Sequence, residues 1–524
     1  MGEDRTPGDR DVDGRRMRRV GIIGSRHWSA GYLVSFSVGC VIRGIPEVIA
    51  YPAPVGYNIV AYYAPVLADF RVWGNGWFLS LFYPPQFSPL PFLLMIPFAT
   101  QLHPYVVLGL FAPAFNGLLA LAVYHYLRRA CMLPVWLCVT GAFFTMIQYS
   151  VLRLSLDMLS ESLALSLGLF TIAVLSTGMS RRREAAACLA LVATELANQL
   201  VLLTLIPPLA YQILKRRSER STTFLLVLMP AILLLGWNFF ILQGGHNIFP
   251  AAQGVTVWFL WTSKSSTGIS PFVNYLKLFE YTDLLAIVPV FLLFLYAPLL
   301  PWMRRKSMQG TLAKWALILL LVTISPLILP WFAFDIWNLW AITLSVPLSI
   351  VAFKGFSEVT SRLTATRRGS LRAYLLILLL LPYTIVGGAF MSMPPQNPFP
   401  LFKYPPFLRY MPSSMLANSI PLQDSLDALT LLAELNATMD QHSILLVHEA
   451  FYGFTALTIS GDKFIINYNL GDPMSAVSYA KTLGFEKIYW IWWLPGYGWF
   501  GLPNPPQGFT VLLQKGRVAI YQFK

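Results

Sequence analysis

A succession of long apolar runs constrains this chain more strongly than any other feature of its sequence. Each run is close to the ~20 residues that a helix needs to cross the hydrocarbon core of a membrane. The runs lie at residues 104–127, 131–150, 156–178, 221–242, 284–303, 311–330, 337–353 and 372–391. Composition agrees, because 56% of the 524 residues are hydrophobic and only 12% are charged, about half the charged fraction of a soluble domain. The sequence therefore predicts a polytopic α-helical membrane protein.

Two apolar stretches do not read as simple spans. The stretch 185–214 is long and is interrupted by Glu195, Asn198 and Gln199, so we expect two short helices that meet at a polar turn. The stretch 88–101 is short and rich in proline, which disfavours a regular helix interior. We expect 88–101 to be re-entrant or interfacial.

The N-terminus begins with a polar, basic stretch at 1–27, for which we expect disorder. The apolar residues 28–41 that follow show no small-residue cleavage site, which favours a retained first transmembrane helix over a cleaved signal peptide. Basic residues before a first helix predict that the N-terminus is cytoplasmic.

Clusters of Lys and Arg between the apolar runs set the topology. They are Arg128–Arg129, Arg181–Arg183, Lys215–Arg217, Arg304–Lys306, Lys354 and the residues from Arg362 to Arg372. If 88–101 does not cross and 185–214 crosses twice, every cluster falls on the cytoplasmic side. This predicts about 11 transmembrane helices in a multi-pass protein of the cell membrane, with the C-terminal tail outside the cytoplasm.

The net charge of +14 belongs to the membrane part, because Lys and Arg balance Asp and Glu from Met391 to the end. The excess therefore indicates topology signals, and nucleic acid is not expected as a partner. Walker, dinucleotide-binding, HExxH and CxxC motifs are absent from the sequence, which disfavours a nucleotide-driven pump.

The tail, residues 392–524, changes character after a proline-rich linker. Short β-branched and aromatic stretches predict strands at 444–447, 464–466, 487–492, 509–513 and 518–521, with helices at 424–439 and 473–483. We expect a small α/β extracytoplasmic domain, in which the aromatic residues of 489–499 form a core or an interfacial belt rather than a sugar platform. The domains are thus 1–27, the transmembrane domain 28–391 with a first outer loop at 43–87, and 392–524.

Acidic residues of the membrane half gather in or beside the segments that this topology places outside. They are Glu47, Asp69, Asp157, Glu161, Glu195, Glu280, Asp283 and Asp335. A carboxylate near hydrocarbon costs several kcal/mol unless it is paired or hydrated. The gathering therefore predicts a polar cavity that opens to the outside.

Such a cavity suits transfer of a head group from a lipid-linked donor to an outer acceptor. The acceptor hydroxyl or amide must be deprotonated, and a carboxylate is the usual base. The leaving polyprenyl phosphate needs cationic or polar partners. Arg43 and Arg153 are the cations nearest in sequence to the acidic residues.

Several short motifs follow one another in a recognisable order. They are Arg43…Pro46-Glu47, Pro54…Gly56-Tyr57, Tyr62, Ala68-Asp69, Leu152-Arg153…Asp157, Asn198-Gln199, Trp337…Trp340…Pro347-Leu348 and Tyr489…Trp493…Gly496…Trp499. This ordered set resembles the GT-C superfamily of integral-membrane glycosyltransferases, which use polyprenyl-phosphate sugars. It is most similar to archaeal members with an outer C-terminal α/β domain. Asn58 departs from the pattern, because related sequences often carry an acid there, and no lysine accompanies Asn198.

The resemblance implies that Asp69 is a catalytic base or metal ligand and that Asp157 shapes the same site; Glu47 is a third catalytic candidate. The candidates for substrate binding are Arg43, Tyr57, Asn58, Arg153, Glu161, Glu195, Asn198 and Gln199. A divalent ion (Mg or Mn) held by Asp69 and Asp157 is the cofactor to consider. The implied partners are a polyprenyl-phosphate-linked sugar, a glycan, lipid or protein acceptor, and the lipid bilayer.

Two other functions stay open from the sequence. The chain could be a transporter or flippase for a lipid-linked or anionic substrate, although its hydropathy shows no internal repeat of the kind many transporters have. It could also be a non-catalytic membrane anchor for the tail.

Overall fold

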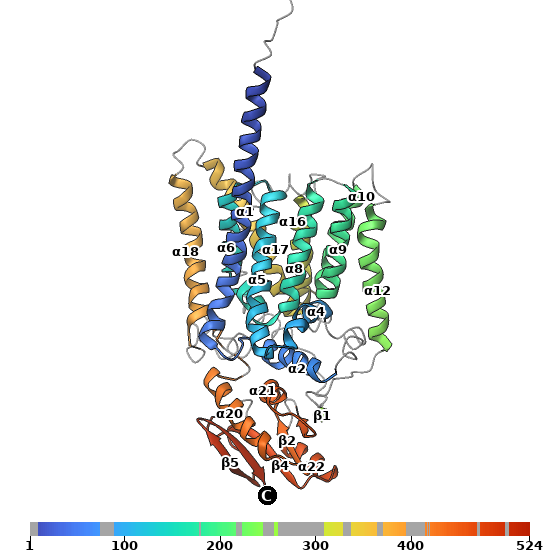
Figure 1. Ribbon diagram of the computed structural model, residues 1–524, viewed down its shortest axis with the longest axis vertical. Helices are drawn as coiled ribbons and strands as arrows, with labels where there is room; N and C mark the ends of the chain where they lie inside the picture. Colours follow the sequence, from blue (N-terminus) through green and yellow to red (C-terminus); the bar gives the residue numbers. More distant parts are fainter. Residues whose placement is uncertain are drawn as a thin grey trace, which may run out of the picture.

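A bundle of long helices stands on a smaller mixed α/β unit formed around the C-terminal tail (Figure 1). The computed structural model describes residues 9–73, 88–177, 180–215, 223–244, 256–259, 309–328, 337–363, 370–394, 414–416, 418, 420–468, 472–497 and 502–524. The first part of α1 projects from the end of the bundle opposite the tail.

The long helices account for most of the apolar runs. They are α1 (Asp9–Ala50), α5 (Pro104–Arg129), α6 (Val135–Met146), α8 (Leu159–Ser176), α9 (Arg181–Ala197), α10 (Gln199–Lys215), α12 (Met229–Gly244), α16 (Gln309–Ile328), α17 (Trp337–Leu363) and α18 (Ser370–Ser392). Five helices in the described part are long and apolar enough to cross a membrane, or six if a bent pair counts as one span. A polytopic helical membrane protein is therefore confirmed. The count of about 11 stays a prediction, and the run 284–303 lies outside the described residues.

Short helices lie at the end of the bundle that faces the tail. They are the π-helix η1 (Ile59–Tyr63), α2 (Ala64–Trp73), α4 (Pro89–Ala99) and α7 (Tyr149–Asp157); a second π-helix, η3 (Phe224–Leu228), precedes α12. With 11 residues, α4 spans about 16 Å, roughly half the ~30 Å of a hydrocarbon core. It is too short to cross on its own.

The N-terminal prediction needs correction in two places. Residues 9–27, expected to be disordered, belong to α1, and this helix continues to Ala50 instead of ending near residue 41. The loop predicted to begin at residue 43 therefore begins after Ala50. The polar sequence of Arg43 and Glu47 suggested a loop, but the two residues lie one helical turn apart and pair on a buried face.

The predicted span 131–150 is shorter than expected. Its helix is α6, which ends at Met146. Helix α7 begins at Tyr149, so it lies almost entirely beyond the predicted span, and the axes of α6 and α7 differ by 68°. By contrast, the interruption predicted within 185–214 is present: Asn198 has an extended backbone (φ −164°, ψ 117°) between α9 and α10.

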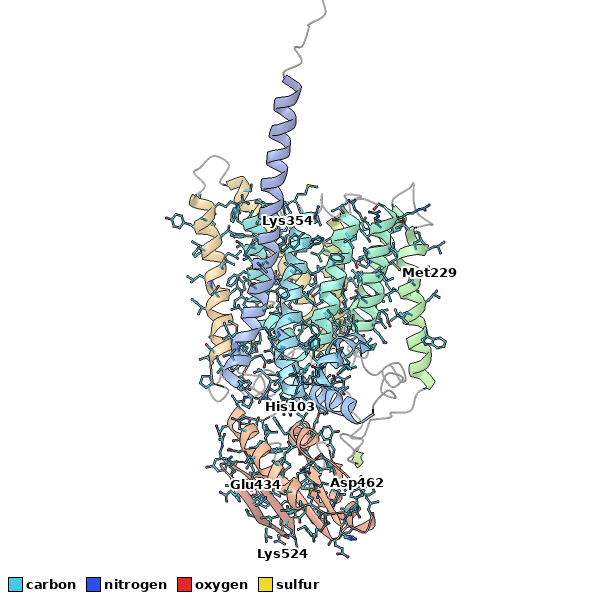
Figure 2. The ribbon with its side chains drawn as sticks, viewed as in Figure 1. His103, Met229, Lys354, Glu434, Asp462 and Lys524 are labelled. Atoms are coloured by element: carbon cyan, nitrogen blue, oxygen red, sulfur yellow. The ribbon has the colours of Figure 1, made fainter. Side chains whose placement is uncertain are left out.

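Basic side chains gather at the end of the bundle far from the tail. Figure 2 places His103 at the tail-facing end and Lys354 at the opposite end. Helix α5 runs from its N-cap His103 to Arg128 and Arg129, which are therefore at the far end. The bundle thus has one strongly basic end, and the tail lies at the other.

The tail contributes five strands to a six-stranded mixed sheet in the order β1-β3-β2-β4-β6-β5. Its strands are β1 (Thr256–Phe259), β2 (Ser443–Val447), β3 (Phe464–Asn467), β4 (Lys487–Trp493), β5 (Phe509–Lys515) and β6 (Val518–Phe523), with helices α20 (Leu422–Thr438), α21 (Glu449–Thr458) and α22 (Pro473–Thr482). The first four strands in this order are parallel, and β6 and β5 are antiparallel additions.

Strand β1 was not expected, because it comes from the segment between α12 and α16. It pairs in parallel with β3, with Thr256 opposite Phe464. The sheet is therefore not built by residues 392–524 alone, since a segment of the membrane half completes it.

The tryptophans of β4 form the centre of this sheet's core. Trp490, Trp492 and Trp493 are all at most 1% exposed, and the rings of Trp490 and Trp492 stack with centroids 5.3 Å apart. The indole N–H of Trp493 donates to Asp424 at 2.8 Å. Since the three rings face protein rather than solvent, the core interpretation holds for β4; Tyr497 is 51% exposed, and Trp499 lies outside the described residues.

His448 is expected to make the stability of part of the tail depend on pH. It is buried between β2 and α21, and its Nδ1 accepts the backbone N–H of Ala450 at 3.1 Å, which caps α21. Burial lowers the pKa of His448 to about 4. The neutral form is therefore favoured in the folded state, so its stabilising contribution is complete above about pH 6.5 and is lost as pH falls toward 4.

We expect the opening free energy of β2 and α21 to fall by about 2 kcal/mol between pH 7 and pH 5, because the unfolded histidine takes up a proton that the folded one rejects. His448→Asn should remove this dependence while keeping a capping side chain. The exposed His442→Asn is the matched control. Hydrogen exchange of both elements at the two pH values measures it, and an equal pH dependence in wild type and His448→Asn would contradict the assignment.

Candidate functional site

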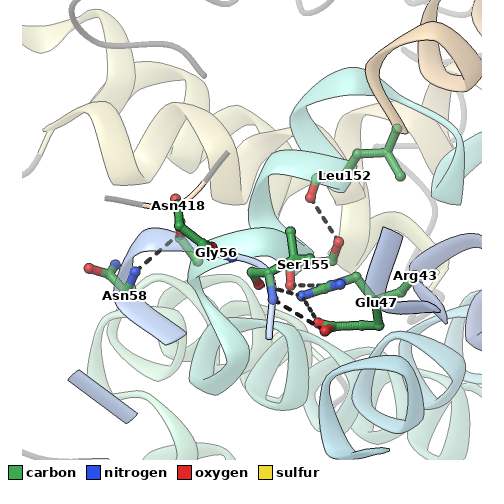
Figure 3. A network of polar contacts seen from close by, with 9 residues as sticks. Arg43, Glu47, Gly56, Asn58, Leu152, Ser155 and Asn418 are labelled. Carbon is green, nitrogen blue, oxygen red and sulfur yellow. Dashed lines mark hydrogen bonds and ion pairs between the residues drawn. The ribbon is translucent and has the colours of Figure 1, made fainter. Parts of the chain in front are cut away.

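An ion pair between Arg43 and Glu47 connects α1 to the loop that follows it (Figure 3). Arg43 is wholly buried and its Nη2 lies 2.7 Å from the Glu47 carboxylate. The pair also holds both backbone groups of Val55: Arg43 Nη2 donates to its carbonyl at 2.8 Å, and its N–H donates to Glu47 at 3.2 Å. Arg43 Nε donates to the carbonyl of Ser155 at 3.0 Å. The pair thus joins α1, the start of the loop and α7.

The three residues after Val55 are each held by a different side chain. The N–H of Gly56 donates to Asn418 Oδ1 at 2.8 Å, and the hydroxyl of Tyr57 donates to Glu449 Oε1 at 2.5 Å. The N–H of Asn58 donates to Asp157 Oδ1 at 3.4 Å. Burial, followed by the charge of Glu449, raises the pKa of Tyr57 well above its usual value, so its hydroxyl keeps the proton that it donates.

Gly56 is required at its position for two reasons. Its φ of +127° lies in a region that side chains rarely adopt, and a Cβ there would collide with the carbonyl oxygen of Leu156. The backbone of the loop therefore rests directly on the last turn of α7.

We expect Gly56→Ala to destabilise the loop by at least about 2 kcal/mol, because φ strain alone costs ~1–3 kcal/mol and the backbone must also move away from Leu156. Hydrogen exchange of residues 55–63 measures the change. Gly44→Ala is the matched control, since a Cβ at Gly44 meets nothing within 4 Å. Equal exchange in the two variants would show that the close approach at Gly56 is absent.

Asp157 lies where the loop, α7 and α8 meet. Its carboxylate forms an ion pair with Arg153, one turn earlier in α7, and only 6% of its side chain is exposed against 21% for Arg153. The cation is therefore the more accessible partner. One carboxylate oxygen faces the loop and the other faces the cation.

Asp157 and Glu161 lie four residues apart in the sequence but do not share a helical face. The helix breaks at Met158 (φ −123°, ψ 65°), so Asp157 ends α7 while Glu161 belongs to the first turn of α8. Glu161 instead accepts from Ser160 Oγ at 2.7 Å and from Asn198 Nδ2 at 3.0 Å.

Asn198 connects this second cluster to the broken helix pair. Its Oδ1 accepts the N–H of Val201 at 3.0 Å, which caps α10, while its Nδ2 reaches Glu161. Glu195 is buried one turn earlier in α9, and Gln199 is half-buried at the start of α10. The break between α9 and α10 therefore brings the side chain of Asn198 to the first turn of α8.

The two clusters meet through η1. The hydroxyl of Tyr63 donates to Ser160 Oγ at 3.1 Å and accepts the N–H of Ser160 at 3.2 Å. Residues 55–63 therefore contact the Arg153–Asp157 pair at one end and the start of α8 at the other. The polar contacts at this tail-facing end are together called the polar seam; they involve Asn58, Tyr63, Arg153, Asp157, Ser160, Glu161 and Asn198.

Asp69 lies in α2, and its side chain is outside the described part of the structure. Its proposed pairing with Asp157 is therefore not tested. Within the described ranges no three His, Cys, Asp or Glu side chains gather closely enough to hold a metal ion. A divalent ion at Asp69 and Asp157 stays a prediction.

Several residues of this site were not identified from the sequence. Asn418 and Glu449 come from the tail and contact a loop of the membrane half more than 350 residues away. The sequence gives one indication of Glu449, because this residue comes just after a predicted strand. Ligands bind at the carboxyl ends of parallel strands. The sequence gives no such indication of Asn418 or Ser160.

No family model matches the sequence, and no curated protein matches it. Among solved structures, the chain is similar to the crystal structure of ArnT from Cupriavidus metallidurans bound to undecaprenyl phosphate. The two are 11% identical, the similarity covers 96% of this chain and 98% of that one, and the TM-score is 0.49.

Proposed function

We propose that this protein is a membrane glycosyltransferase that moves a sugar from a polyprenyl-phosphate donor to an acceptor on the tail side of the membrane. The observation that carries the proposal is the pairing of a nearly buried carboxylate, Asp157, with a more accessible cation, Arg153, at a polar seam inside an apolar bundle. The ordered resemblance of the sequence to GT-C enzymes supports the same reaction.

The chemistry requires a base and a partner for the leaving phosphate. A carboxylate, Asp69 or Asp157, takes the proton of the acceptor hydroxyl, and the acceptor oxygen attacks the anomeric carbon of the sugar. The bond between that carbon and the phosphate oxygen breaks, and polyprenyl phosphate leaves with the electron pair. Arg153 balances the negative charge that develops on the phosphate.

The remaining site residues have supporting roles in this proposal. Arg43 and Glu47 position Val55 and α7, because the groups that would serve chemistry are engaged with each other and with backbone. Tyr57 and Asn58 shape the loop beside Asp157. Glu161, Glu195, Asn198 and Gln199 form the polar side of the sugar site at the α9–α10 interruption.

The topology follows from charge. The basic residues at the far end of the bundle support a cytoplasmic position for that end, and in this proposal the seam and the tail lie outside the cytoplasm. The protein would then receive its donor laterally from the outer side of the bilayer. The short helices α2 and α4, which do not span, lie at this end.

A transfer assay tests the proposal. Proteoliposomes would receive polyprenyl-phosphate monosaccharides, each radiolabelled in the sugar, together with a membrane extract as the source of acceptor. We expect label in a new product and release of polyprenyl phosphate, with neither in protein-free liposomes. Label that only crosses the bilayer in the intact donor would contradict transfer and favour a flippase.

A further inference from the structure

Resting on this proposed function, we infer that three tail residues, Asn418, Glu449 and Gly453, position the loop that carries the site, so the tail is a working part of the active centre. These three residues are called the tail clamp below. They contact the loop at Gly56, Tyr57 and Val60 respectively.

The contacts alternate between the two halves of the protein. Val55 and Asn58 are held from the membrane side by the Arg43–Glu47 pair and by Asp157. Gly56 and Tyr57, which lie between them, are held from the tail side. Because the loop is fixed from both sides at successive residues, release of either side would change the distance between the loop and Asp157.

Glu449 is itself placed with precision by the tail's fold. It is the first residue of α21, directly after the capping residue His448 at the carboxyl end of β2. One turn later, Gly453 lets the α21 backbone approach η1, because a Cβ at this position would collide with the carbonyl oxygen of Val60. At Gly453 the backbone of α21 therefore packs against η1 without an intervening side chain.

Asn418 is positioned by contacts of the preceding segment with the helical bundle. The segment before it returns to the end of α18, where the N–H of Met415 donates to the carbonyl of Phe390 at 2.8 Å. Ser414 Oγ donates to the carbonyl of Met393 and accepts the N–H of Leu416 at 3.0 Å. The position of Asn418 thus depends on the bundle, and that of Glu449 depends on the sheet.

Hydrogen exchange on the full-length protein in lipid nanodiscs tests the clamp without any substrate. Glu449→Ala should speed exchange of residues 55–63 by about tenfold or more, since it removes a hydrogen bond to a charged acceptor. Glu449→Gln keeps an acceptor for Tyr57 and should give a smaller increase. Asn418→Ala is a second variant and should give a several-fold increase at the same residues. Glu434→Ala, an exposed glutamate on α20, is the matched control.

Kinetics give the second readout, with the labelled polyprenyl-phosphate sugar as probe. We expect Glu449→Ala to lower kcat about tenfold with a smaller change in KM, and Glu449→Gln to recover most of the rate. Exchange of residues 55–63 in Glu449→Ala and Asn418→Ala equal to that of Glu434→Ala would overturn the clamp. If wild type transfers no sugar, the proposed function fails, whereas faster exchange in the two variants would still support the clamp.

Discussion

Asp157→Asn is expected to lower the rate of sugar transfer by about two to four orders of magnitude, the range that a positioned acid or base contributes. Asparagine keeps an oxygen for the N–H of Asn58 but provides neither the negative charge nor the proton acceptor. The measurement is the initial rate of transfer at saturating donor, with the melting temperature recorded for each variant. Asp462→Asn, at an exposed position of the tail labelled in Figure 2, is the matched control.

The same rate measurement on Asp69→Asn distinguishes the role of Asp69 from that of Asp157. A larger loss of transfer rate in Asp69→Asn than in Asp157→Asn would identify Asp69 as the base and Asp157 as the residue that orients Arg153. Undiminished transfer in both variants would exclude the site assignment.

Glu47→Leu is expected to produce the largest loss of stability. It leaves Arg43 charged and wholly buried without its counter-ion, and breaking one partner of a buried pair costs about 3–5 kcal/mol. The double variant Arg43→Met with Glu47→Leu should recover much of this loss, since no buried charge remains unpaired. The melting temperature of the protein in nanodiscs measures both effects.

A second i,i+4 pair provides the control. Lys354 and Glu358 lie 2.7 Å apart, but their side chains are 13% and 27% exposed. Glu358→Leu should therefore cost only about 1 kcal/mol or less. If Glu47→Leu melts at the same temperature as Glu358→Leu, the Arg43–Glu47 pair does not hold the loop as described.

The parts of the fold that depend on local sequence were predictable. Apolar length identifies helices in lipid, because backbone groups there must be satisfied within one segment. The break at Asn198 was predictable as well, since Asn198 and its polar neighbours interrupt an apolar stretch and Asn readily caps a helix.

Features that depend on tertiary pairing were not predictable in the same way. The continuation of α1 to Ala50 requires Arg43 and Glu47 to be buried as a pair, and neither residue alone indicates this. Strand β1 has too little sequence to be recognised without its partner β3. The tail's contacts at Gly56 and Tyr57 join residues far apart in the chain, which no local pattern records.

We expect the donor's phosphate to lie at the tail-facing seam beside Arg153 and Asp157. Photo-crosslinking tests this position, with a polyprenyl phosphate that carries a photoreactive group near the phosphate as the probe. Peptide mapping then locates the adducts. We expect adducts on residues 55–63 and 149–161 that excess polyprenyl phosphate suppresses. Suppressible adducts confined to the opposite, basic end of the bundle, or no suppressible adducts at all, would contradict this position of the phosphate.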